Sequence, residues 1–129
     1  EFVGLDVTAH PFQQWIPKSR EARVIVIGDD LFAVEIIAGS ENGYLDWRAD
    51  YPSNTYRPTQ PPDAVQRGTR QLMAKLELAY GALDFVITPE GDWVFLEINA
   101  GGQYGWLEEA TCLPISAALA GLLAEGEAT

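Results

Sequence analysis

Residues 81–104 read GALDFVITPEGDWVFLEINAGGQY. Within this stretch, residues 82–88 and 93–98 are rich in Phe, Val, Ile and Leu, a composition typical of β-strands. The four residues between them, Pro-Glu-Gly-Asp at 89–92, are typical of a turn. The stretch therefore predicts a β-hairpin with a four-residue loop, in which Thr88 pairs with Trp93.

The register of this hairpin brings polar side chains together. Counting back from the loop places Asp84 opposite Glu97, and the two-residue period of a strand puts Asn99 on the same face. Carboxylates that face each other across two strands repel unless a cation lies between them. Mg²⁺ prefers oxygen ligands of this kind, so the pattern predicts a metal site at these three residues. A solvated acidic face is the alternative, since a slip of one residue would separate the two carboxylates.

Length and composition predict a single soluble domain. The chain has 129 residues, enough for a hydrophobic core, and it shows neither an apolar run of membrane-spanning length nor a signal-peptide pattern. The lone Cys112 excludes an internal disulfide and any zinc site with several cysteines. We expect a reducing, cytoplasmic location and no membrane partner.

Charge is distributed unevenly along the chain. The net charge is −11, and all eight Lys and Arg residues lie between Lys18 and Lys75. Nucleic acid is not an expected partner, because binding a phosphate backbone requires clustered cations. The asymmetry suits a molecule with a phosphate-binding half and a cation-binding half, although an acidic surface also serves solubility.

A second hairpin is predicted at residues 22–38, where two β-branched runs flank the turn residues Gly28, Asp29 and Asp30. Apolar residues occur on both faces of these strands, so both faces of the sheet are expected to be covered. Arg23 is the exception, because a guanidinium in a nearly buried strand needs an anion, either a phosphate or a carboxylate. An exposed strand end is the alternative reading.

The remaining segments predict one long loop and three helical pieces. Residues 39–63 contain four prolines and read as a loop, in which Arg48 and Arg57 are candidate anion contacts. A helix is predicted from Pro62 to Tyr80, ended by Gly81, with a buried stripe at Val65, Thr69, Leu72, Leu76 and Ala79. A helical turn is expected at 106–110 and a terminal helix at 114–125. The fold class is therefore α+β, an antiparallel sheet with flanking helices.

The order of several short motifs resembles the C-terminal half of an ATP-grasp ligase. These motifs are QQWIPK at 13–18, EARV at 21–24, DWR at 46–48, GALDF at 81–85 and FLEIN at 95–99. The sequence is most similar to ATP-grasp peptide maturases, which close lactone or lactam rings in ribosomally made peptides. It is also similar to their relatives that add glutamate to a ribosomal protein. The likeness runs from about Pro11 to Glu125.

The resemblance implies a role for each matching position. Asp84, Glu97 and Asn99 would hold Mg²⁺ bridging the ATP phosphates, and Arg23 would contact phosphate and the developing acyl phosphate. The backbone of Gln14, Trp15 and Ile16 would form the hinge that binds adenine, with Lys18 nearby, and Arg48 would face the reacting carboxylate. Cys112 departs from the family pattern, which tends to have glycine there.

The chemistry that the resemblance implies is attack of a peptide carboxylate on the γ-phosphate of ATP, followed by capture of the acyl phosphate by a hydroxyl or an amine. We expect residues 1–129 to be the C-terminal portion of an ATP-grasp domain, without the N-terminal domain and central lobe, and inactive alone. Its exposed apolar surface makes a homo-oligomer a further expectation. The alternatives are a glutamate-adding ligase and a non-catalytic module that binds a nucleotide or a peptide.

Overall fold

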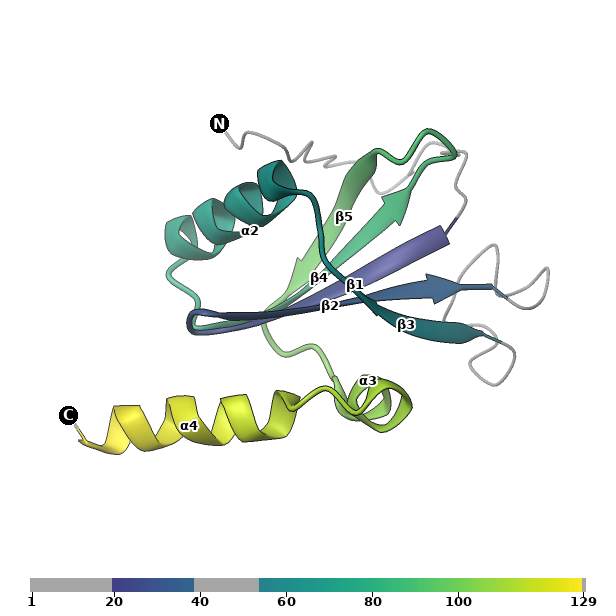
Figure 1. Ribbon diagram of the computed structural model, residues 1–129. Coiled ribbons are helices and arrows are strands. Elements are labelled where there is room, and N and C mark those ends of the chain that lie inside the picture. The colour runs from purple at the N-terminus through teal and green to yellow at the C-terminus, as the bar shows by residue number, and fades with distance from the viewer. Residues whose placement is uncertain (1–19, 39–53, 129) are drawn as a thin grey trace.

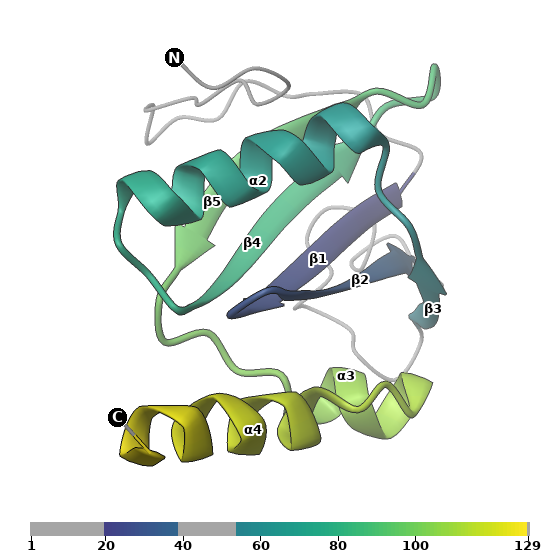
Figure 2. The same ribbon diagram turned by 60° about the vertical axis from the view of Figure 1, so that its left-hand side comes forward.

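A computed structural model of the protein describes residues 20–38 and 54–128. These residues form one antiparallel sheet of five strands in the order β3-β2-β1-β4-β5. The strands are β1 (Arg20–Ile27), β2 (Asp30–Ile37), β3 (Thr55–Thr59), β4 (Tyr80–Ile87) and β5 (Trp93–Asn99). Helix α2 (Asp63–Lys75) lies across one face, and α3 (Gly105–Thr111) and α4 (Ile115–Ala128) lie along the other (Figure 1, Figure 2). The α+β class expected from the sequence is confirmed.

Two hairpins build the centre of this sheet. Strands β1 and β2 pair as predicted, with Gly28 at a φ of 58° in the turn, and β4 and β5 form the second hairpin. The hairpins join along β1 and β4, where Arg23 lies directly opposite Asp84. This junction connects residues 61 positions apart, and it places two charged side chains in the middle of the sheet.

Each face of the sheet has its own apolar core, as the sequence pattern predicts. On the α2 side, Val24 and Phe85 pack with Leu72 of the helix. On the opposite side, Ile25 packs with Leu107 of α3 and Ile115 of α4. Side chains of this size stabilise a fold by about 1.5–3 kcal/mol each when they are fully buried. The sheet is therefore a rigid, doubly covered platform for the polar residues that it carries.

Helix α2 begins where the sequence predicts but ends five residues early. Two hydrogen bonds close it, from the Glu77 amide to the Ala74 carbonyl (3.1 Å) and from the Leu78 amide to the Met73 carbonyl (3.0 Å). Glu77 has a φ of 55°, so this residue adopts the left-handed conformation that usually ends a helix at glycine. The predicted end at Gly81 is wrong, because residues 80–87 are needed for β4. Leu76, placed on the buried stripe by the sequence, is 46% exposed.

The predicted loop at 39–63 contains a strand, which corrects the sequence interpretation. Residues 39–53 lie outside the described residues, but β3 pairs with β2 from Ile37–Thr55 to Ala33–Thr59. Proline discourages a strand assignment, yet Pro58 is tolerated here because β3 is at the edge of the sheet. Residues 55–59 form a strand because they pair with β2, and the local sequence does not reveal this partner.

The two C-terminal helices agree with the predicted helical turn and terminal helix. Helix α3 ends at Cys112, which has a φ of 61° and donates its amide hydrogen to the Glu108 carbonyl at 2.8 Å. A left-handed residue at the end of a helix is usually glycine, which is the residue that the resemblance implies at this position. Among the described residues, no helix has both the length and the apolarity needed to cross a membrane.

Candidate metal and phosphate site

Asp84 lies directly opposite Glu97, as the sequence predicts, but the register that brings them together differs from the predicted one. Ile87, not Thr88, pairs with Trp93, so the loop is one residue longer than expected. A β-bulge then follows, because Phe85 pairs with Phe95 whereas Asp84 pairs with Glu97. The extra residue is Leu96. The two deviations cancel, and the predicted carboxylate pair results.

Hydrogen bonds explain the longer loop. The Thr88 amide donates to the Asp92 carbonyl at 2.9 Å, and the Asp92 amide donates back to the Thr88 hydroxyl at 3.0 Å. The Gly91 amide donates to the Thr88 carbonyl at 2.8 Å, with Gly91 at a φ of 92°. Thr88 is therefore a turn residue, whose hydroxyl satisfies the loop backbone.

The bulge decides which face Glu97 occupies. Without it, the register set by Ile87 and Trp93 would place Glu97 opposite Leu83, a residue of the core beneath α2. A charged side chain there would be buried among apolar groups at a high cost. With Leu96 as the extra residue, Glu97 turns to the Asp84 side, and Asn99 follows on the same face.

Arg23 and Asp84 form a buried ion pair across β1 and β4. The Arg23 Nε donates to Asp84 Oδ1 at 2.9 Å, and Nη2 donates to Oδ2 at 3.3 Å. The two residues are 5% and 3% exposed. The expectation that Arg23 needs an anion is confirmed, and the anion that the structure shows is the side chain of Asp84, whereas a bound phosphate or carboxylate ligand stays a prediction. The alternative of an exposed strand end is wrong. This pair holds both side chains in one geometry.

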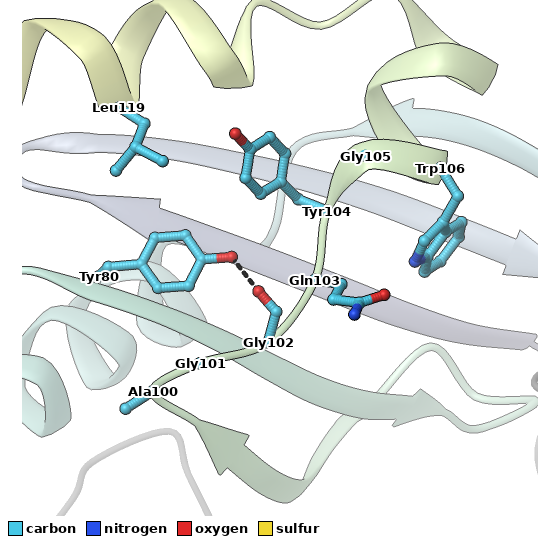
Figure 3. A pocket seen from close by; sticks show the side chains of 9 residues that line it. All are labelled: Tyr80, Ala100, Gly101, Gly102, Gln103, Tyr104, Gly105, Trp106 and Leu119. Atoms are coloured by element: carbon cyan, nitrogen blue, oxygen red, sulfur yellow. Dashed lines mark hydrogen bonds between the residues drawn. The ribbon is translucent and has the colours of Figure 1, made fainter.

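The loop at 100–104, which follows Asn99, is tied to the same residues. The Gly101 amide donates to Asn99 Oδ1 at 2.8 Å, and Arg23 Nη1 donates to the Gln103 carbonyl at 3.0 Å. The Tyr80 hydroxyl donates to the Gly102 carbonyl, as Figure 3 shows. Three side chains from different strands therefore fix the path of this loop.

Gly102 has a steric reason to be glycine. A Cβ at this position would lie 2.5 Å from the Cβ of Ala82, a contact that real Cβ atoms essentially never make. Ala82 is the residue opposite Asn99 in the sheet. The close approach lets the loop fold back against β4 directly beside the polar residues.

The donor set fits a hard divalent cation. Asp84, Glu97 and Asn99 share one face and offer two carboxylates and an amide oxygen; Asp84 is buried, whereas Glu97 and Asn99 are exposed. Mg²⁺ commonly binds one or two carboxylates and keeps several waters. In the described part of the chain, no three residues of the His, Cys, Asp and Glu types cluster as a metal site, and the predicted set contains two carboxylates and an asparagine.

Five of the predicted site residues, Gln14, Trp15, Ile16, Lys18 and Arg48, lie outside the described residues. Their roles stay predictions. Of the two arginines considered in the long segment, Arg57 is described, and its Nη2 donates to Glu35 Oε1 at 2.6 Å. Its anion is therefore supplied within the sheet.

Glu35 is the centre of a polar cluster that the sequence interpretation missed. Besides Arg57, Arg20 Nε (2.9 Å) and the Thr59 hydroxyl (3.0 Å) donate to its carboxylate. Burial by itself raises the pKa of Glu35, but the hydrogen bonds from Arg57, Arg20 and Thr59 outweigh it and leave the pKa below its ordinary value. A single acid inside the apolar run LFAVEIIA was the available signal, since a buried carboxylate needs partners.

Comparison with known proteins adds structural relatives. The macrocyclase MdnC of Microcystis aeruginosa, solved with the precursor peptide MdnA, is 34% identical, with a TM-score of 0.72 over 86% of this chain and 34% of MdnC. A RiPP-associated ATP-grasp ligase of Chryseobacterium gregarium, solved with ADP and a leader and core peptide, is also 34% identical over the same shares, with a TM-score of 0.77. No protein-family model and no curated protein matches the chain.

A further structure, the ATP-grasp ligase PsnB, is 20% identical with a TM-score of 0.62 over 83% of this chain and 34% of PsnB, and it supports the fold alone. This chain spans about a third of the length of these structures. The resemblance expected from the sequence is therefore confirmed: the chain has part of the ATP-grasp fold and is a structural relative of the RiPP-associated ATP-grasp ligases and macrocyclases.

Proposed function

We propose that this chain provides the metal- and phosphate-binding portion of an ATP-grasp ligase that acts on a ribosomally made peptide. The observation that carries the proposal is the convergence of Arg23, Asp84 and Glu97 on one face of the sheet, two of them as a buried pair. A 34% identical relative was solved with ADP and a leader and core peptide, which supports a nucleotide and a peptide as ligands.

In this proposal, Asp84, Glu97 and Asn99 hold Mg²⁺. When bound, Mg²⁺ supplies charge neutralisation at the ATP phosphates. Arg23 contributes a second cation at the same place, and its bonds to Asp84 and Gln103 fix its guanidinium before any nucleotide arrives. A pre-oriented cation is effective because it needs no reorganisation when charge develops.

Residues outside the described part complete the proposed site. Gln14, Trp15 and Ile16 would bind adenine through their backbone, with Lys18 beside them, as the resemblance implies. Arg48 would hold the reacting carboxylate. These assignments rest on the motif positions at 13–18 and 46–48.

The proposed reaction has two steps. An oxygen of a peptide carboxylate attacks the γ-phosphorus of ATP, the bond to the β–γ bridging oxygen breaks, and ADP leaves. A hydroxyl or an amine of the peptide then attacks the acyl carbon, loses its proton and expels inorganic phosphate, giving an ester or an amide. Positioning and charge stabilisation suffice for this chemistry, so no side-chain nucleophile is required.

The test uses the complete ligase, meaning this chain joined to the lobes that its longer relatives possess, with Mg²⁺, ATP and an acidic precursor peptide. We expect ADP release and the loss of one water from the peptide for each bond formed, read by mass spectrometry. Glu97→Gln should abolish both, and Glu90→Gln, an exposed residue in the turn of the same hairpin, should abolish neither. An active Glu97→Gln enzyme would contradict the proposal.

The same assay separates the rival functions. A gain of one glutamate residue in place of the loss of water would identify a glutamate-adding ligase. Saturable nucleotide or peptide binding without ADP release would identify a non-catalytic binding module.

Dependence on ATP and a single free cysteine, Cys112, are the grounds on which we propose a cytoplasmic setting. A homo-oligomer stays a prediction, to be checked by light scattering.

A further inference from the structure

A cavity of about 690 Å³ opens between the loop at 100–104, the start of α3 and helix α4. Figure 3 shows its side chains: Tyr80 from the start of β4, Tyr104 and Trp106 around the start of α3, and Leu119 from α4. A cavity of this size lies in the range of sites that bind small molecules or peptide side chains. Its lining residues carry no charge, although it lies beside the polar residues described above.

The aromatic walls of the cavity are held in place by further contacts. The rings of Tyr80 and Tyr104 are 6.4 Å apart, and Trp106 packs edge-on against Tyr56 at 5.2 Å. Ser116 of α4 donates to the Tyr104 hydroxyl at 3.3 Å. Burial raises the pKa of Tyr80 above its ordinary value, against an opposing effect of Arg23, and its hydroxyl donates to the Gly102 carbonyl. The walls are therefore largely pre-formed.

The cavity is coupled to the candidate metal site through its floor. Gly101 and Gly102 line the cavity. The Gly101 amide donates to Asn99, and Arg23 donates to the carbonyl of Gln103, two residues further along the same loop. Consecutive Cα atoms are about 3.8 Å apart, so Gly101 lies within about 8 Å of Asn99. A ligand group in the cavity is thus adjacent to the site at which the phosphates are proposed to bind.

The uncharged lining selects the occupant. The cavity is bounded by tyrosine, tryptophan, leucine, alanine, glycine and one glutamine. An acidic side chain would lose its hydration against these surfaces. An apolar side chain gains from the same surfaces, and an aromatic ring also gains from edge-to-face contacts.

We propose that this cavity receives an apolar side chain of the peptide substrate, best an aromatic one, about one or two residues along the peptide from the reacting carboxylate, since an extended chain advances about 3.3–3.6 Å per residue. The inference rests on the proposed function. It gives the loop after Asn99 a part in substrate selection, and it predicts that precursor peptides carry a ring or a large aliphatic group beside each reacting acid.

The first experiment uses the 129-residue chain and two probes, N-acetyl-phenylalanine amide and N-acetyl-aspartate amide, in a nitrogen-15 NMR titration. We expect saturable shifts of the Gly101 and Gly102 amides and the Trp106 indole with the phenylalanine probe alone. Equal shifts with both probes, or none with either, would overturn the inference.

Matched variants on one helix test the wall of the cavity. Leu119→Glu places a carboxylate at the lining and should weaken the phenylalanine probe at least about tenfold. Leu123→Glu changes a residue of the same helix that is 61% exposed and lies outside the lining. This variant should bind the phenylalanine probe as tightly as the parent chain does. If the amide spectrum shows that Leu119→Glu is unfolded, Gly105→Leu replaces it, because a Cβ at Gly105 meets no atom within 4 Å.

The complete ligase then assigns the occupant. With an active enzyme, Leu119→Glu should raise KM for a peptide bearing phenylalanine beside the reacting acid about tenfold or more, with little change in kcat. An unchanged KM would contradict the inference and would indicate that another segment of the ligase fills the cavity. An active Glu97→Gln enzyme would instead contradict the proposed function, so the two failures can be told apart.

Discussion

Asp84 and Glu97 lie opposite each other on β4 and β5 because Leu96 is an extra residue in β5. The bulge turns Glu97 away from the core beneath α2 and toward the Arg23–Asp84 pair. Bulges often occur beside functional sites, where they redirect a side chain. In this chain the redirected side chain is one of the proposed metal ligands.

Deleting Leu96 should remove the bulge and keep the metal site. With the Phe85–Phe95 pairing unchanged, Glu97 then follows Phe95 directly and still lies opposite Asp84, so the chain should continue to bind Mn²⁺, a spectroscopic substitute for Mg²⁺. Deleting Ile98 is the contrasting change, because it puts Asn99 opposite Leu83 in the core beneath α2. That variant should bind Mn²⁺ more weakly and be less stable in urea, since an amide would face apolar side chains. Loss of Mn²⁺ binding in the Leu96 deletion would contradict the assigned register.

The Arg23–Asp84 pair should show strong coupling in stability. Asp84→Ala removes the carboxylate partner of a buried guanidinium and should lower the free energy of unfolding by about 3–5 kcal/mol. The double variant Arg23→Met with Asp84→Leu should recover most of this loss, because apolar groups replace both charges. Urea unfolding of the single and double variants measures the coupling. Additive losses would mean that the pair does not act as a unit.

Gly102 should be intolerant of a side chain, whereas its neighbour should not. Gly102→Ala forces a Cβ against that of Ala82 and should cost about 1–3 kcal/mol as overpacking. Gly101→Ala is the control, since its nearest contact would be Asn99 Oδ1 at 3.8 Å. Thermal unfolding of both variants checks this. Equal melting temperatures would contradict the close packing of the loop on β4.

Glu35 should contribute to the acid sensitivity of the fold. Its pKa is below the ordinary value of 4.5 in the folded state, so its stabilisation is fully present above that value. The stabilisation is lost as pH falls through the lowered pKa, because protonation removes the pairs with Arg20 and Arg57. Glu35→Gln should therefore be less stable than the parent chain at pH 7, with a gap that closes at acidic pH. A gap that is constant with pH would contradict this, and Glu90→Gln serves as the exposed control.

Much of the fold follows from local patterns in the sequence. β-branched runs with turn residues between them predict both hairpins, and helical spacing with prolines in front predicts the start of α2. The end of α2 was missed because a glutamate, Glu77, takes the left-handed position that glycine usually occupies. Strand β3 was missed because it forms by pairing with β2, whereas the prolines in its local sequence indicate a loop.

The candidate site was partly predictable for a different reason. The pairing of Asp84 with Glu97 was predicted correctly through a register with two compensating deviations, the longer turn and the bulge. The partner of Arg23 was not predictable, because the junction of β1 with β4 is a long-range pairing. The cavity, too, depends on bringing Tyr80, the loop and Leu119 together, which no local pattern encodes.

The most direct test of the metal assignment is paramagnetic broadening by Mn²⁺ in the nitrogen-15 spectrum of this chain. We expect broadening centred on the amides of Asp84, Glu97 and Asn99, and its loss in Glu97→Gln. That variant should change stability by less than about 1 kcal/mol, because Glu97 is an exposed residue. Broadening spread over the acidic surface, or unchanged in Glu97→Gln, would contradict the central claim that this sheet face holds the metal.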